Sequence, residues 1–252
     1  GIDVIILFPK GKVSDIQKLQ LTTLGENITA LEVEGTFDNC QDMVKTAFVD
    51  PEISENMALT SANSINIARW LSQMFYYFIV YKNRPNPNKK FLISVPSGNF
   101  GNICAGIISK MMGLPIDHFI ASTNINDTVP EYLKSGNYNP KKSIQTITNA
   151  MDVGDPSNFI RIQKIFNNDF FKLKKNLSGF SYNDKLTEKA LKEIYKISGY
   201  IADPHGAIGY LGLKEYMDSL KDKGLYQGVF LETAHPIKFR GIVENVLKKE
   251  IE

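Results

Sequence analysis

The sequence predicts an α/β protein built from open parallel sheets flanked by helices. Two observations support this prediction. Short, unbroken apolar runs recur along the chain, and stretches with helical periodicity alternate with them across short links. Unbroken apolar runs are typical of parallel strands that are buried on both faces, and their alternation with helices is typical of a doubly wound sheet.

The first elements indicate part of a smaller domain. Residues 4–8 form a solid apolar run that predicts a buried parallel strand, and residues 14–24 predict a helix that stops at Gly25. A second strand, at residues 27–33, and a second helix, at residues 35–48, repeat the pattern. We therefore expect residues 1–58 to be part of a smaller α/β domain, and residues 59–252 to form a larger one.

The larger domain begins with an aromatic-rich helix, predicted at residues 63–81, whose cluster at residues 75–78 we expect in the core. A strand at residues 91–95, a helix at residues 103–112 and a strand at residues 116–122 then form a βαβ unit. Farther on, the periodicity predicts helices at residues 158–171, 184–196 and 207–220, a strand at residues 229–231, and a last helix from Lys238.

The composition favours a small molecule as the partner. The 252 residues carry a formal net charge of +2 and the lysines are spread along the chain, so we expect neither nucleic acid nor a membrane as a partner. Cys40 and Cys104 lie in no CxxC and in no spacing with histidine that suits zinc, so we expect no metal and a cytoplasmic location. The chain starts at Gly1 without an initiator methionine, and we expect it to be a fragment.

A Gly-rich turn joins the strand at residues 91–95 to the helix that follows. A turn of this kind gathers backbone N–H groups and the positive end of a helix dipole around one point, which favours an anion such as a phosphate. Glycines there allow close approach to a ligand and positive φ, while serine and asparagine side chains add donors. The alternative is a tight structural turn with Asn102 as the N-cap. The candidate residues are Ser97, Gly98, Asn99, Phe100, Gly101 and Asn102.

Three further polar segments are candidates for a site. Thr233 belongs to the polar segment at residues 232–236, which directly follows the predicted strand at residues 229–231. Ligands bind at the carboxyl edge of a parallel sheet, so the Thr233 hydroxyl is a candidate contact. His235 nearby is either catalytic or a buried histidine that holds the loop through a backbone hydrogen bond. Asn63, Ser64 and Asn66 either cap the predicted helix or face a ligand with both asparagines on one helix face. For the similar turn at residues 203–206 we favour the structural interpretation.

Several blocks of sequence together resemble threonine synthase, in its bacterial and fungal branch. They cover nearly the whole chain in the order expected for that family, and they lie at residues 8–14, 61–66, 95–101, 123–130, 149–153 and 233–239. The resemblance implies the fold of the tryptophan synthase β family, incomplete here, in which pyridoxal phosphate lies between two α/β domains. Residues 59–252 are then the larger, cofactor-binding domain.

The resemblance also implies roles for the candidate residues. The loop from Ser97 to Asn102 would hold the cofactor phosphate, and Thr233 would hydrogen-bond the pyridine nitrogen. Asn63, Ser64 and Asn66 would face the substrate. The implied reaction converts O-phospho-L-homoserine and water to L-threonine and phosphate, catalysed by a monomer or a homodimer.

One catalytic group of that family does not occur in this sequence. The Schiff-base lysine of the family lies in a Phe-Lys-Asp segment, whereas the one Phe-Lys pair here, Phe171-Lys172, is followed by leucine. We therefore expect no catalytic residue in this chain and no activity from the chain alone. Two other interpretations stay open: a threonine-synthase-like phospholyase that releases 2-oxobutyrate, and a non-catalytic module that binds a phosphorylated metabolite.

Overall fold

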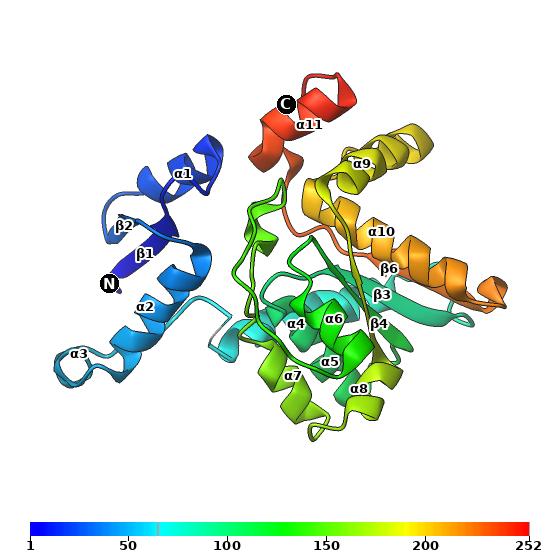
Figure 1. Ribbon diagram of the computed structural model, residues 1–252, viewed down its shortest axis with the longest axis horizontal. Coiled ribbons are helices and arrows are strands. Elements are labelled where there is room, and N and C mark those ends of the chain that lie inside the picture. The colour runs from blue at the N-terminus through cyan, green and yellow to red at the C-terminus, as the bar shows by residue number, and fades with distance from the viewer. Residues whose placement is uncertain (65, 252) are drawn as a thin grey trace. The chain divides into compact units, whose positions relative to one another are not determined.

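The computed structural model describes residues 1–64 and 66–251, and these form two compact units (Figure 1). The first unit is Gly1–Thr60 and the second is Ser61–Glu252. All strand pairs in the described residues are parallel, as the sequence predicts. No helix in the described part of the chain is long and apolar enough to cross a membrane.

The first unit is a two-stranded parallel sheet with three helices. Val4 pairs with Ile28 at one end of the sheet and Pro9 with Val33 at the other. Its two longer helices both begin with capping boxes, because Ser14 and Thr36 each accept from a backbone N–H three residues on. The elements of this unit are β1 (Val4–Pro9), α1 (Asp15–Thr22), β2 (Ile28–Val33), α2 (Phe37–Val49) and α3 (Pro51–Asn56).

The prediction that β1 is a buried strand is wrong for most of its length. Phe8 and Pro9 are buried, but Val4, Ile6 and Leu7 are half-buried and Ile5 is 67% exposed. A sheet of two strands with three helices has too few elements to cover both of its faces, so the apolar run stays partly open.

The second unit is built on a four-stranded parallel sheet in the order β5-β4-β3-β6. The two central strands are buried along nearly their whole length, which matches their unbroken apolar sequence. The strands are β3 (Lys90–Pro96), β4 (His118–Thr123), β5 (Leu177–Ser181) and β6 (Tyr226–Phe230). The helices are α4 (Ala68–Lys82), α5 (Gly101–Met111), α6 (Thr128–Ser135), α7 (Phe159–Ile165), α8 (Phe170–Asn176), α9 (Asp184–Ser198), α10 (Pro204–Ser219) and α11 (Arg240–Leu247).

Helices cover both faces of this sheet (Figure 1). On one face α10 packs against β3 and β4, and Ser94 of β3 donates from its Oγ to the carbonyl oxygen of Gly209 at 2.7 Å. On the other face Ile93 and Val95 belong to a core that α4, α5 and α7 complete. Successive residues of β3 therefore serve opposite faces, as the pleat of a strand requires.

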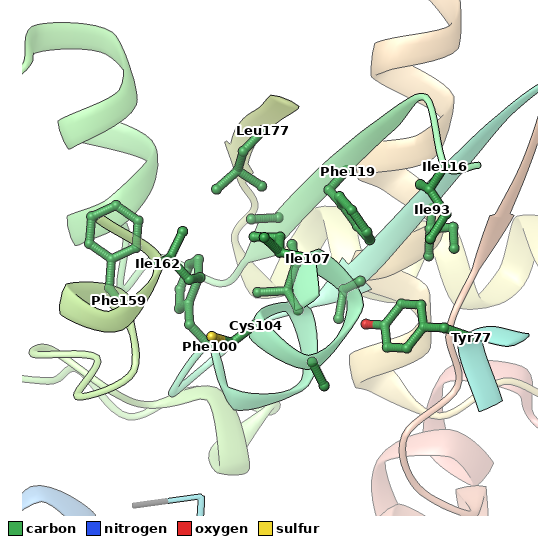
Figure 2. Packing of buried hydrophobic residues seen from close by; sticks show 14 of the residues in the cluster. Tyr77, Ile93, Phe100, Cys104, Ile107, Ile116, Phe119, Phe159, Ile162 and Leu177 are labelled. Atoms are coloured by element: carbon green, nitrogen blue, oxygen red, sulfur yellow. The ribbon is translucent and has the colours of Figure 1, made fainter. Parts of the chain in front are cut away.

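The main core lies between the sheet and the helices α4, α5 and α7 (Figure 2). Tyr77 of α4 is fully buried and meets Phe119 of β4 edge to face, with ring centroids 6.2 Å apart. The prediction that residues 75–78 all lie in the core is wrong, because Phe75 is 67% and Phe78 38% exposed. Four consecutive residues point around most of a helix, and only one stripe of α4 faces the core.

The predicted helix at residues 158–171 is two helices, α7 and α8. Asn167 and Asn168 lie between them with φ of 57° and 58°, in the left-handed region. Asparagine adopts this region more readily than most residues, and there it ends one helix before the next begins. The short strand β5 and the short helices α3 and α6 were not among the elements expected from the sequence.

Candidate functional site

Two predicted site segments leave the sheet at the same edge. Strands β3 and β6 are parallel neighbours in which Ser94 pairs with Phe230, and the Leu231 N–H donates to the Ser94 carbonyl oxygen at 3.0 Å. Ser97 and Thr233 each follow the paired residues by three positions. The carboxyl edge of this sheet therefore carries both the Gly-rich loop and Thr233, at the place where open α/β sheets bind ligands.

The Gly-rich loop ends in a helix start that has no side-chain cap. Helix α5 begins at Gly101, and Phe100 occupies the N-cap position with φ of 62°. The first helical hydrogen bond comes from the Cys104 N–H to the Phe100 carbonyl oxygen at 3.1 Å, so the preceding N–H groups have no acceptor within the helix. Those N–H groups and the helix dipole favour an anion at this point.

Asn102 is not the N-cap, and its side chain does not reach toward this point. Its Oδ1 accepts from the Tyr77 hydroxyl at 2.7 Å, and its carbonyl oxygen lies 3.0 Å from the same hydroxyl. The helix starts earlier than the structural alternative assumes, because Phe100 takes the left-handed conformation. Its buried ring packs edge to face on Phe159, with centroids 5.7 Å apart, which offsets the cost of that conformation.

The two glycines of the loop do not adopt the positive φ that was expected for them. A Cβ on Gly98 would lie 2.8 Å from Met151 Cα and 2.9 Å from the Ala150 carbonyl oxygen, and one on Gly101 would lie 2.7 Å from Ser64 Cβ. The glycines are required because other parts of the protein approach the loop closely, and not because of the backbone conformation.

Asn99 fixes the loop to two distant segments. Its Nδ2 donates to Ser64 Oγ at 3.2 Å, and its Oδ1 accepts from the N–H and the hydroxyl of Ser157 at 2.7 and 3.0 Å. The fully buried Asn158 adds bonds from its Nδ2 to the Asn99 carbonyl oxygen and to Ser64 Oγ, both at 3.0 Å. The Asn99 amide therefore holds the loop in shape.

Arg161 connects the same segments from the start of α7. Its guanidinium donates to the Ser64 carbonyl oxygen at 2.9 Å and to Asn158 Oδ1 at 3.0 Å, and it lies 5.0 Å from the centre of the Trp70 ring. Sequence reasoning did not identify Ser157, Asn158 or Arg161. They stand at an expected helix start, and no local pattern indicates that they contact a loop nearly sixty residues away.

The segment that contains Asn63, Ser64 and Asn66 is a turn and not the first turn of a helix, because α4 begins only at Ala68. Asn63 Oδ1 accepts a hydrogen bond from the Ser64 N–H. Asn66 Oδ1 accepts one from the Ala68 N–H at 3.0 Å. Such short side-chain bonds to nearby backbone compete with helix formation, so the two asparagines do not share a helix face. Of the three, Ser64 contacts the Gly-rich loop directly, and Ile65 lies outside the described residues.

Thr233 lies in the loop after β6 and is exposed. His235 in the same loop is also exposed, and its Nδ1 accepts from the Ile237 N–H at 3.2 Å. His235 thus holds the loop through a backbone hydrogen bond, as the structural interpretation expects, although it is not buried. Among the described residues, no group of three or more His, Cys, Asp or Glu side chains is arranged to hold a metal ion.

Glu232, which directly precedes Thr233 in the chain, forms an acidic pair with Asp203; Asp203 is fully buried and Glu232 is half-buried. Asp203, fully buried at the N-cap of α10, accepts from the His205 N–H and from His205 Nδ1, both at 2.8 Å. Glu232 accepts from the Asp203 N–H at 3.3 Å. Burial and the neighbouring Asp203 raise the pKa of Glu232 to about 9. Burial opposes ionisation of Asp203, but hydrogen bonds from His205 and Glu232 outweigh it and lower the pKa of Asp203.

No family model matches the chain. Its fold is that of an enzyme that binds pyridoxal phosphate: it superimposes on the PLP-bound threonine synthase of Brucella melitensis with a TM-score of 0.84 and 33% identity, over 99% of this chain and 58% of that one. This confirms the predicted α/β fold of parallel sheets flanked by helices.

The similarity to threonine synthase extends over the whole chain. Threonine synthase of Buchnera aphidicola from Acyrthosiphon pisum is 49% identical over 252 residues, which is 100% of this chain and 57% of the relative. The crystal structure of Escherichia coli threonine synthase matches with a TM-score of 0.92 and 41% identity, over 99% of this chain and 57% of that one. The chain is therefore homologous to threonine synthase, and it spans somewhat over half the length of the curated relatives it matches.

Proposed function

We propose that this chain is part of a threonine synthase, which converts O-phospho-L-homoserine and water to L-threonine and phosphate with pyridoxal phosphate. The observation that carries the proposal is the 49% identity to a threonine synthase over all 252 residues. The bound cofactor in the Brucella melitensis relative supports the assignment of pyridoxal phosphate.

The Gly-rich loop and Thr233 would hold the two ends of the cofactor. The N–H groups at the start of α5 that have no acceptor within the helix suit a phosphate. The loop that would bind the phosphate consists of Ser97, Gly98, Asn99, Phe100, Gly101 and Asn102. The Thr233 hydroxyl, three residues beyond the paired end of β6, would hydrogen-bond the pyridine nitrogen. A hydroxyl there, in place of a carboxylate, leaves the ring nitrogen less firmly protonated. When bound, pyridoxal phosphate supplies the electron sink for elimination and replacement chemistry.

The turn before α4 would face the substrate. Ser64 accepts hydrogen bonds from both Asn99 and Asn158, so a change at the substrate side of this turn is transmitted to the cofactor loop. Asn63 and Asn66 would contribute amide groups to the same side. We assign residues 1–58 to part of the smaller domain and residues 59–252 to the larger, cofactor-binding domain of a cytoplasmic monomer or homodimer. The Schiff-base lysine would come from the part of the enzyme that this sequence does not match.

Incubating the full-length protein with O-phosphohomoserine and pyridoxal phosphate tests the proposal. We expect threonine and phosphate in equal amounts. Formation of 2-oxobutyrate without threonine would favour the phospholyase, and cofactor binding without turnover would favour the non-catalytic module. The Thr233→Val variant removes one hydroxyl with little change in shape. It serves as the matched test of the cofactor contact.

A further inference from the structure

The loop that carries Thr233 rests on the first turn of α10 through Glu232. A carboxylate oxygen of Glu232 accepts from the Asp203 N–H at 3.3 Å. Gly206, in the same turn, has no room for a side chain, because a Cβ there would collide with Glu232 Oε1. The carboxyl group of Glu232, the residue before Thr233, therefore lies directly against the start of α10.

Three polar atoms of this contact are buried without a hydrogen-bond partner among the described residues. They are Asp203 Oδ2, Glu232 Oε1 and His205 Nε2. Two buried carboxylate oxygens left unpaired would be costly, and two ionised carboxylates side by side would also repel each other. The side chains of Glu232 and Asp203 are within hydrogen-bond reach of each other. A single proton held between the two carboxyl groups would satisfy both oxygens and remove one of the two charges.

We propose that Glu232 and Asp203 share one proton, and that this proton fixes the Thr233 segment on the first turn of α10; the consequence for the cofactor rests on the proposed role of Thr233. The proton lies mainly on Glu232. Asp203 is the N-cap of α10 and accepts two bonds from His205, both of which favour its ionised form.

Two other titratable groups in the described residues face the pair. His205 directs Nδ1 at Asp203 and packs its ring on Phe239, with centroids 4.8 Å apart. Tyr200 is half exposed, and burial together with the charges of Glu232 and Asp203 raises its pKa. An ionised Glu232 would place a negative charge next to Thr233 and favour protonation of the pyridine nitrogen. When the shared proton lies on Glu232, the one negative charge of the pair lies on Asp203 instead.

Infrared spectroscopy detects the shared proton directly. In full-length protein with ¹³C-labelled glutamate, we expect one protonated carboxyl band at pH 7 that shifts with the label. We expect the band to disappear in Glu232→Gln and to persist in the control Glu55→Gln, which alters an exposed glutamate of α3. A wild-type spectrum without this band, or a band that survives in Glu232→Gln, would overturn the shared proton.

The pH dependence of stability gives a second readout. The pKa of Glu232 is about 9 in the folded protein against 4.5 ordinarily, so the folded state holds the extra proton between these values. Stability should therefore fall as pH rises toward 9, with the unfolding constant increasing by up to about tenfold per pH unit. Glu232→Gln should lack this component and Glu55→Gln should retain it. Equal slopes in wild type and Glu232→Gln would overturn the proposal.

The affinity for pyridoxal phosphate tests the positioning role. Glutamine at position 232 can still donate to Asp203 and accept from its N–H, so Glu232→Gln should bind the cofactor within about twofold of wild type, whereas Glu232→Ala should bind it about tenfold more weakly. Equal affinity of Glu232→Ala and wild type would refute the positioning role. If wild type binds no cofactor, the proposed function fails, while the infrared band still decides the shared proton.

Discussion

Replacing Asn158 with alanine perturbs the shape of the Gly-rich loop without touching the loop itself. The Asn158 side chain makes three hydrogen bonds: to Ser64 Oγ, to the Asn99 carbonyl oxygen, and from the guanidinium of Arg161. Each buried bond of this kind contributes about 0.5–1.5 kcal/mol, so the loss of all three should lower the free energy of unfolding by about 1.5–4.5 kcal/mol.

Urea denaturation of the full-length protein measures this loss, and the control is Asn139→Ala, because Asn139 is exposed in the loop after α6. A freed loop must be ordered again when the cofactor phosphate binds, at a cost of about 1–2 kcal/mol per residue. The Kd for pyridoxal phosphate should therefore rise about tenfold in Asn158→Ala. If Asn158→Ala matches Asn139→Ala in both measurements, then Asn158 does not hold the loop.

Gly98→Ala forces a Cβ against the backbone at Met151, so it should lower both the free energy of unfolding and the affinity for pyridoxal phosphate. If both values equal those of wild type, the backbone at Met151 does not pack closely on residue 98. Thr233→Val should weaken cofactor binding about fivefold, the equivalent of one hydrogen bond of about 1 kcal/mol, and leave the thermal midpoint of the cofactor-free protein nearly unchanged; an unchanged Kd would remove Thr233 from the site. Burial raises the pKa of Asp152 to about 6 from 3.8. The stability that its protonated form contributes should be complete below pH 3.8 and be lost as pH rises through 6. Thermal unfolding of Asp152→Asn should lack this pH dependence, and a pH profile equal to that of wild type would contradict the prediction.

Local sequence predicts most of the strand and helix order, because apolar periodicity depends on near neighbours. The strand, turn and helix around Ser97 to Asn102 are an example, with β3 and α5 within two residues of their expected bounds. Burial was harder to predict. The aromatic run of α4 and the apolar run of β1 have core-like sequences, yet Phe75 and Ile5 are each 67% exposed, since burial depends on which other elements are present to cover a face.

The reasons why particular residues occupy the site depend on contacts that are distant in sequence. Gly98 is needed because the backbone at residues 150–151 packs against it, and Asn99 is held by Ser64 and Ser157. No spacing rule reveals such pairs. The importance of Glu232 likewise becomes visible only when the fold brings it to Asp203, a residue whose own sequence context indicates no more than a helix cap.

The most direct test of the proposed site is a crystal structure of the full-length protein with pyridoxal phosphate bound. We expect the cofactor phosphate at the N-terminus of α5, within hydrogen-bond distance of backbone N–H groups from Gly98 to Ile103. We expect the pyridine nitrogen within hydrogen-bond distance of the Thr233 hydroxyl. A phosphate bound away from α5, or a pyridine nitrogen paired with a side chain other than Thr233, would contradict it.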